Sequence, residues 1–248
     1  MRIDVYTIFP AMFVSPLGEG LLGKAIHGGT IDVRVHDIRD YAADKHRQVD
    51  DAPFGGGPGM VMKPEPVFEA VTATLGYGMD ELERLRDEVR VIMLTPRGER
   101  MDQARVRELA GGSHLALICG RYEGVDERVL EHLCTDALSV GDYVLSGGEL
   151  ASLVVIEAVT RLVPGVVGNE ESLADESFSR GLLEYPQYTR PSNYRGWRVP
   201  DTLLSGDHEA IRRWRHEAAL EWTRRIRPEM LPGGDEEEGG TGDRQGRS

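Results

Sequence analysis

Cysteine is nearly absent from this sequence. Its 248 residues include two cysteines, Cys119 and Cys134, each inside an apolar run, and no C-x-x-C or H-E-x-x-H pattern occurs. This scarcity argues against a disulfide framework and a structural zinc site, and it favours a reducing, cytoplasmic environment. We therefore predict no protein metal site, although the sequence leaves a requirement for Mg²⁺ open.

Long apolar runs are also missing. No stretch of about 18 apolar residues occurs, so no membrane-spanning helix is expected. The opening residues, MRIDVYTIFP, carry Asp4 and hold too short an apolar stretch for a secretory signal peptide. A composition of 40% hydrophobic and 29% charged residues is ordinary for a soluble globular protein, which at this length can bury one large core or two smaller ones.

Positive charge is scarce overall but concentrated near the C-terminal end. The net charge of −13 by itself disfavours a nucleic-acid partner. Residues 190–228, however, hold nine arginines against five acids, whereas residues 232–248 hold five acids against two arginines. This asymmetry predicts a basic surface on a C-terminal module, with a solvated helix face as the alternative. The acidic, glycine-rich end has no apolar anchor and is expected to be disordered.

Apolar periodicity predicts an α/β protein. Strands are expected at residues 2–9, 31–38, 89–94, 114–119 and 137–140, and helices at 64–75, 101–110, 125–133 and 146–162. Strands that alternate with helices at this spacing are typical of a parallel sheet covered by helices. In the last helix, Ser146 and Glu149 form a capping-box pattern, and the expected buried stripe is Leu150, Leu153, Val154 and Ala158.

A dinucleotide-binding pattern is present in the wrong place. Gly18, Gly20 and Gly23 match G-x-G-x-x-G, yet about nine residues separate them from the preceding strand. Glu19 would also place a carboxylate beside a pyrophosphate. We expect a helix with a loose start at this position instead.

Three glycine-bearing segments follow predicted strands. Thr95-Pro96-Arg97-Gly98 follows one strand, and residues 119–124 and 141–148 follow the next two. Because the carboxyl ends of parallel strands share one edge of a sheet, these segments predict a small-molecule site at that edge. Glycine there lets a ligand approach bare backbone groups, whereas the alternative is that the glycines only make tight turns.

A long segment without periodicity covers residues 41–59. It ends in the run 55–60, GGGPGM, which is not a P-loop because no Gly-Lys-Ser/Thr follows. Lys45, His46 and Arg47 precede this run. Basic residues beside an exposed glycine turn predict contact with a nucleic-acid backbone, and a mobile surface loop is the alternative.

The C-terminal part is predicted as a linker and a helical module. Residues 166–181 are acidic and lack periodicity, and residues 182–194 are irregular. A helix is expected from Asp207 to about Arg225, with Arg212 and Arg215 on the face opposite its buried one. Its buried face is predicted to consist of Ile211, Trp214, Ala218 and Trp222. The predicted organisation is therefore an α/β domain over 1–165, a linker over 166–181, a small helical domain over 182–231 and a tail over 232–248.

Several long stretches resemble the bacterial tRNA (guanine-N1)-methyltransferases. They are GGGPGM at 55–60, CGRYEGVDERV at 119–129, SVGDYVLSGGEL at 139–150, YTRP at 188–191 and LSGDH at 204–208. In this order they extend the resemblance over nearly the whole chain. It implies a SPOUT-type α/β fold whose C-terminal part is tied into a trefoil knot, an exception to the rule that chains avoid knots. It also implies a homodimer with active sites at the subunit interface.

The activity that the resemblance implies is methyl transfer from S-adenosylmethionine to N1 of guanine 37 in tRNA, next to the anticodon. The positions matching the family's cofactor loops are Leu94, Thr95, Pro96, Gly98, Gly120, Tyr122, Glu123, Val140, Gly141, Asp142, Tyr143, Val144, Leu145, Gly147 and Gly148. The positions expected to contact tRNA are His46, Gly59, Met60, Arg121, Ser177, His208 and Arg212.

The chemistry requires an acid–base pair of defined character. Guanine N1 carries a proton and is a poor nucleophile until that proton leaves, so the site needs a carboxylate at N1 and a cation near O6. The resemblance assigns the cation to Arg161. The family's base is normally an Asp directly before Ser-Phe, whereas here Glu176 occupies that position with Asp175 beside it. Glu176 is favoured, and Asp175 stays open. Two alternative functions stay open. One is methylation of another RNA, and the other is RNA binding by a protein that holds an adenosine ligand without catalysis.

Overall fold

The chain forms two compact units. The computed structural model describes residues 1–168 and 176–232. The units are Met1–Gly168, called unit 1 below, and Asn169–Ser248, called unit 2. Among the described residues, no helix is both long enough and apolar enough to cross a membrane. The predicted tail falls almost entirely outside the described residues.

Unit 1 is an α/β fold around one sheet. Its strands are β1 (Arg2–Thr7), β2 (Asp32–Asp37), β3 (Asp50–Asp51), β4 (Val61–Met62), β5 (Arg90–Arg100), β6 (His114–Cys119) and β7 (Asp136–Ser139). Its α-helices are α1 (Val14–Gly18), α2 (Gly20–His27), α3 (Pro64–Leu75), α4 (Leu82–Glu88), α5 (Gln103–Ala110), α6 (Glu127–His132) and α7 (Glu149–Thr160). Short 3₁₀ helices cover Pro10–Phe13, Ile38–Tyr41 and Met79–Glu81.

The five long strands make a parallel sheet in the order β2-β1-β6-β5-β7. Every strand pair within it is parallel, with Val5 opposite Leu117 and Leu117 opposite Ile92. The predicted strands and their parallel arrangement are therefore confirmed. Because β6, β5 and β7 are neighbours, the segments that follow their carboxyl ends meet at one edge.

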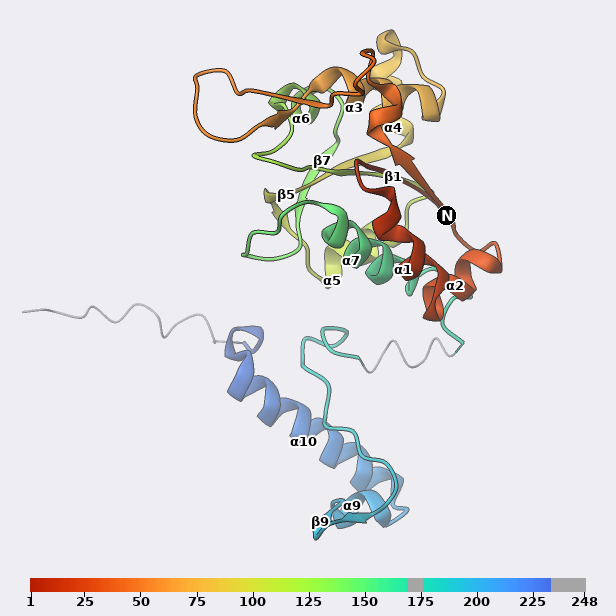
Figure 1. Ribbon diagram of the computed structural model, residues 1–248. Coiled ribbons are helices and arrows are strands. Elements are labelled where there is room, and N and C mark those ends of the chain that lie inside the picture. The colour runs from red at the N-terminus through yellow and green to blue at the C-terminus, as the bar shows by residue number, and fades with distance from the viewer. Residues whose placement is uncertain (169–175, 233–248) are drawn as a thin grey trace, which may run out of the picture. The chain divides into compact units, whose positions relative to one another are not determined.

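Helices cover both faces of this sheet (Figure 1). On one face α1, α2, α5 and α7 bury a cluster that includes Phe13, Leu109 and Val155. On the other face α3, α4 and α6 bury a second cluster around Tyr6 and Leu85. Strands buried on both faces explain why the sequence of β5 and β6 reads as continuous apolar runs.

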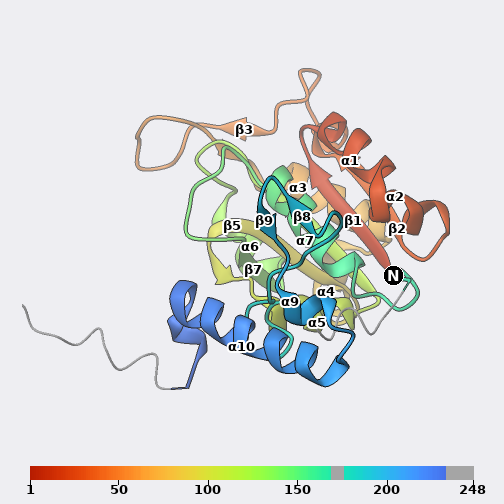
Figure 2. The same ribbon diagram turned by 90° about the horizontal axis from the view of Figure 1, so that it is seen from below.

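The segment between β2 and α3 contains the glycine run. Its ends are held by β3 and β4, which pair antiparallel, with Asp50 opposite Met62. Gly55, Gly56, Gly57 and Gly59 all have positive φ, and the intervening loop, orange in both views, extends away from the sheet (Figures 1 and 2). The prediction of a long irregular loop here is confirmed.

The G-x-G-x-x-G segment is helical, as predicted. Gly18 ends α1 and Gly20 begins α2 with φ of +63°. A Cβ on Gly23 would lie 2.4 Å from the carbonyl oxygen of Gly18. These glycines therefore allow a tight junction between two short helices, and no phosphate site is needed to account for them.

The predicted turn at Thr95–Gly98 is wrong. Strand β5 does not end at Leu94 but continues to Arg100, with a register shift between Leu94 and Glu99 along β7. A Cβ on Gly98 would lie 2.4 Å from the carbonyl carbon of Ala137. Gly98 thus serves close packing of β5 on β7, and the intervening residues bulge out of the ladder.

The predicted start of α7 is also wrong, and its predicted buried stripe is right only in part, because Leu153 and Ala158 pack against the core whereas Leu150 and Val154 do not. The helix begins at Glu149, after an N-cap at Gly148 that makes no side-chain capping bond. Val155, Ile156 and Val159 are buried, whereas Leu150 is 53% exposed and Val154 is 48% exposed. The core therefore lies against a face of α7 rotated from the predicted one.

Unit 2 contains one long helix. Its elements are β8 (Asn193–Tyr194), β9 (Trp197–Arg198), α9 (Asp201–Leu204), α10 (His208–Ile226) and a 3₁₀ helix at Pro228–Met230. The predicted helix is confirmed as α10, with the Asp207 side chain accepting from the N–H groups of Glu209 and Ala210. Its predicted face is wrong at Trp222, which is exposed, because Ala219 and Thr223 hold the buried positions.

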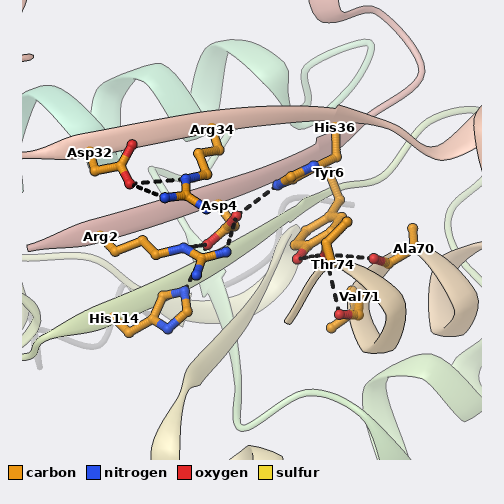
Figure 3. A network of polar contacts seen from close by, with 10 residues as sticks. All are labelled: Arg2, Asp4, Tyr6, Asp32, Arg34, His36, Ala70, Val71, Thr74 and His114. Atoms are coloured by element: carbon orange, nitrogen blue, oxygen red, sulfur yellow. Dashed lines mark hydrogen bonds and ion pairs between the residues drawn. The ribbon is translucent and has the colours of Figure 1, made fainter. Parts of the chain in front are cut away.

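A buried carboxylate organises the amino end of β1 (Figure 3). Asp4 is fully buried, and its oxygens lie 2.7 Å from Nε2 of His36 and 2.7 Å from Nε2 of His114. Arg2 donates to the same carboxylate at 3.0 Å. Burial alone would raise the pKa of Asp4, but the hydrogen bonds from the two histidines and Arg2 outweigh it and lower the pKa below its usual value.

Candidate functional site

A cleft of about 520 Å³ opens beside the bulge of β5 and the carboxyl ends of β6 and β7. Three segments line it, and they come from the bulge of β5, the β6–α6 loop and the β7–α7 loop. The predicted cofactor residues among the lining are Leu94, Thr95, Pro96, Gly120, Tyr122, Glu123, Val140, Gly141, Tyr143, Val144, Leu145, Gly147 and Gly148. Leu138 and Ala151 add apolar surface. The structure thus brings together segments that sequence periodicity had placed at one sheet edge.

Two of the predicted cofactor residues do not line the cleft. Gly98 lies against the backbone of β7, as described above. Asp142 is exposed, and one oxygen lies 3.5 Å from an Arg100 Nη atom. Both neighbour the cleft without facing it.

The β6–α6 loop has unusual backbone conformations. Tyr122 has φ of +60° although it carries a side chain, and Gly124 has φ of +135°. The N–H of Glu123 donates to the Met60 carbonyl at 3.0 Å, and a Cβ on Gly59 would lie 2.3 Å from a Glu123 oxygen. The glycine run of residues 55–60 is therefore packed against this wall of the cleft.

The β7–α7 loop turns on Gly141. Its φ of +156° disfavours any residue with a side chain, and a Cβ there would lie 2.5 Å from the exposed Tyr143 ring, which would have to move. Ser139 Oγ donates to the Gly141 carbonyl at 2.9 Å. Tyr143 and Val144, farther along the loop, are exposed.

The two loops are joined to each other. The N–H of Gly148 donates to the Gly120 carbonyl at 2.9 Å, and Arg121 and Gly147 form an antiparallel bridge. At the same place Arg121 Nε donates to an oxygen of Glu149 at 2.8 Å. Thr7, at the end of β1, donates to the other oxygen of Glu149 at 2.8 Å. A fully buried carboxylate thus connects both loops to the sheet.

Sequence reasoning missed Thr7 and Glu149. The Ser-Gly-Gly-Glu run resembles a capping box, a pattern in which the Glu side chain bonds to the start of its own helix. That interpretation gave no reason to expect the Glu149 carboxylate to point into the protein. A usable signal was the position of Thr7 at the end of a parallel strand, where polar side chains face the site edge.

The proposed catalytic residues lie in different units. Arg161 follows the last residue of α7 in unit 1, and its N–H donates to the Glu157 carbonyl. Glu176 belongs to unit 2, where it lines a small cleft with Arg180, Arg212 and others. Asp175 lies outside the described residues.

The residues expected to contact tRNA are spread over both units. His46 is exposed in the long loop of unit 1, and Gly59 and Met60 lie against Glu123. Ser177 Oγ accepts from the N–H of Glu184 at 2.9 Å in unit 2. His208 and Arg212 are exposed on the first turns of α10.

Cys119 ends β6 directly before the cleft and is completely buried. Burial, with the nearby Glu149 carboxylate, raises the pKa of the Cys119 thiol well above its usual value. Neither this residue nor any group of three or more His, Cys, Asp or Glu side chains within residues 1–168 and 176–232 is arranged to hold a metal ion.

Comparison with known proteins gives one consistent result. The family model described as tRNA (Guanine-1)-methyltransferase TrmD matches residues 1–233. The tRNA (guanine-N(1)-)-methyltransferase of Geobacter sulfurreducens is 52% identical, over 93% of this chain and 91% of its own. That of Geobacillus kaustophilus is 51% identical, over 93% of this chain and 91% of its own. That of Heliobacterium modesticaldum is 52% identical, over 94% of this chain and 85% of its own. The chain belongs to the tRNA (guanine-1)-methyltransferase family.

Proposed function

We propose that this enzyme transfers a methyl group from S-adenosylmethionine to N1 of guanine 37 in tRNA. The observation that carries the proposal is the glycine-lined cleft beside the bulge of β5 and the carboxyl ends of β6 and β7 in a chain of this family. Such an enzyme works where tRNA is used, so we place it in the cytoplasm.

The cleft suits S-adenosylmethionine in several respects. Its lining includes Gly120 and Gly141, which have no side chain, and Leu138 and Val140 offer apolar surface for an adenine ring. Glu123 and Glu127 add carboxylates to a site for a ligand with a positively charged sulfur. When bound, S-adenosylmethionine supplies an electrophilic methyl carbon. The residues proposed to hold it are those of the three lining segments. We extend the proposal to Gly98 and Asp142, which support these segments from outside the cleft.

Side chains of this protein are proposed to carry out the proton transfer. Glu176 takes the proton from guanine N1 as the nitrogen–carbon bond forms and the sulfur–carbon bond breaks, and Asp175 is the alternative base. Arg161 balances the negative charge that develops at O6. A positioned general base contributes on the order of 10²–10⁴-fold to the rate.

Unit 2 is proposed to supply tRNA affinity. Its arginines stack on aromatic rings, with Arg215 4.9 Å from the Tyr185 ring centre and Arg225 4.1 Å from that of Trp222. Cation and aromatic surfaces of this kind bind nucleic acid through phosphates and stacked bases. The residues proposed to contact tRNA are His46, Gly59, Met60, Ser177, His208 and Arg212, and the domains retain the bounds 1–165, 166–181, 182–231 and 232–248.

We also propose a homodimer with shared active sites. The exposed Leu150 and Val154 are four residues apart on α7 and so share a face, and Val144 and Leu145 of the cleft loop are exposed as well. An exposed apolar face on a helix of this kind supports contact with a second subunit. The C-terminal trefoil knot and a role for Mg²⁺ are part of the same family-based proposal.

The test is methyl transfer to defined RNA. Purified protein is incubated with S-adenosylmethionine carrying a labelled methyl group and with tRNA that has either guanine or adenine at position 37. We expect label only in the guanine substrate, and 1-methylguanosine after digestion. Label in both tRNAs, or none in either, would contradict the proposal.

A further inference from the structure

The carboxylate of Glu149 is buried at the start of α7 and bonded on both oxygens. Glu149 is the first residue of α7, yet its side chain is 0% exposed. One oxygen accepts from Thr7 Oγ1 at 2.8 Å and the other from Arg121 Nε at 2.8 Å. The amino end of the helix favours a negative charge at this position.

Arg121 directs its donors into the protein. Besides the Glu149 contact, one Nη atom lies 3.3 Å from the Ser146 carbonyl, and the other lies 3.4 Å from the Met12 sulfur. The guanidinium also lies over the Phe9 ring at 4.6 Å from its centre. With 17% of its side chain exposed, Arg121 has little surface left for RNA.

The side chain of Arg121 also touches the cleft loop that it faces. A Cβ on Gly147 would lie 2.1 Å from Arg121 Nε, so the guanidinium covers this glycine. The backbones of Arg121 and Gly147 pair directly, and Gly148 donates to Gly120. Two loops of the cleft therefore share one ion pair and one short stretch of backbone pairing.

A buried ion pair is an inefficient way to stabilise a fold. Removing two charges from water has a large free-energy cost, and an apolar pair of similar size is often equally stable or better. An ion pair with directional bonds does, however, specify one geometry, because its partners must meet at defined angles. An apolar pair can therefore replace an ion pair that only stabilises the fold, but it cannot replace one that fixes the geometry of the loops.

We propose that Glu149 and Arg121 are positioning residues that fix the two glycine loops in the shape that binds S-adenosylmethionine. The resemblance to the family implied that Arg121 contacts tRNA. In this proposal Arg121 instead acts from inside the protein. The inference rests on the proposed function, since the ligand is the proposed cofactor.

The experiment compares single and paired replacements in the full chain. Glu149→Gln keeps the size and a bond to Thr7 but removes the charge, and the double variant Arg121→Met/Glu149→Leu replaces the pair by apolar groups. The control double variant Arg84→Met/Glu88→Leu removes an exposed pair on α4 with the same 2.8 Å separation of Nε and a carboxylate oxygen. Calorimetry with S-adenosylmethionine, tRNA binding and thermal unfolding are measured for each.

We expect Glu149→Gln to weaken cofactor binding at least about tenfold and to raise KM for S-adenosylmethionine, because small displacements of positioning groups have large effects. Affinity for tRNA should stay within about twofold. The apolar double variant should match the wild-type Tm or exceed it while cofactor binding stays weak. The control should change neither property.

Several outcomes would overturn the inference. Native cofactor affinity in the apolar double variant would make the pair purely structural. If the double variant instead lost tRNA affinity and kept cofactor affinity, Arg121 would contact RNA. If the wild-type protein itself failed to bind S-adenosylmethionine, the proposed function would be wrong. Failure of the positioning role alone would instead appear as normal binding by both the wild type and the apolar double variant.

Discussion

A methyl group on Gly148 would lie 2.8 Å from the Cα atom of Cys119. This contact is between two backbones, so neither partner can move aside as a flexible side chain would. Gly148→Ala should destabilise the fold by about 1–3 kcal/mol, the usual cost of overpacking. Gly120→Ala is the matched control, because its Cβ would lie 3.1 Å from the Val125 side chain and at an ordinary contact distance of 3.9 Å from the Leu94 carbonyl oxygen. Urea unfolding of both variants tests this, and equal stabilities would contradict it.

The general base can be tested by removing one acid at a time. Glu176→Gln should lower the single-turnover rate by on the order of 10²–10⁴-fold with little change in cofactor affinity. Raising the pH should partly restore the rate, because guanine then loses its N1 proton unaided. Asp175→Asn should do much less. If Asp175→Asn abolishes activity and Glu176→Gln does not, the base is one residue earlier.

The Asp4 network predicts a defined acid response. The pKa of Asp4 is lowered from its usual value of 3.8, so its stabilisation is complete above about pH 4 and is lost as the pH falls through the folded-state pKa. Asp4→Asn should cost on the order of 2–3 kcal/mol at pH 7. The difference between wild type and variant should shrink below pH 4. Urea unfolding at pH 7 and pH 3 measures this, and a difference independent of pH would count against the role of the carboxylate.

Arg212 on α10 tests the tRNA surface. Arg212→Gln should weaken tRNA binding and reduce the slope of log K against log salt by about 0.7–0.9, the value for one phosphate contact. Arg84→Gln is the control, because Arg84 lies in unit 1 and pairs with Glu81 and Glu88. Filter binding across a salt series gives both slopes. An unchanged slope for Arg212→Gln would remove that residue from the RNA contact.

The exposed face of α7 tests the homodimer. Light scattering should give about twice the chain mass of 27.5 kDa for the wild type. Leu150→Glu/Val154→Glu should give a single chain mass, because charges in an apolar interface are costly. Val14→Glu is the control, since Val14 is 74% exposed on α1. A doubled mass for the α7 variant would place the interface elsewhere.

The strands of the sheet could be predicted because each is a short apolar run buried on both faces. Their spatial order could not, since β1 pairs with β6 across more than a hundred residues, with Arg2 opposite His114. The buried face of α7 was also beyond periodicity. Apolar residues surround most of this helix, so Leu150 and Val155 fit equally well as core positions in the sequence.

The cleft was predictable in outline but not in its internal connections. Strand ends and glycines locate the loops, whereas the individual cofactor residues, most of which line the cleft, were implied by the resemblance to the family. The Glu149 contacts join residues 142 and 28 positions apart in the sequence, to Thr7 and Arg121 respectively. A local pattern such as a capping box cannot reveal such partners, because it considers only the neighbouring turn.

The chain's two cysteines offer a practical advantage for spectroscopy. Cys119 and Cys134 are both buried, and burial raises the pKa of Cys134 to about 12 and that of Cys119 in the same direction. Thiol reagents attack thiolates, so the folded protein should react slowly with maleimides. A cysteine introduced at one exposed position in each unit would then carry a spin label or fluorophore selectively in an otherwise native sequence. Distances between the units could be followed in this way as tRNA is added.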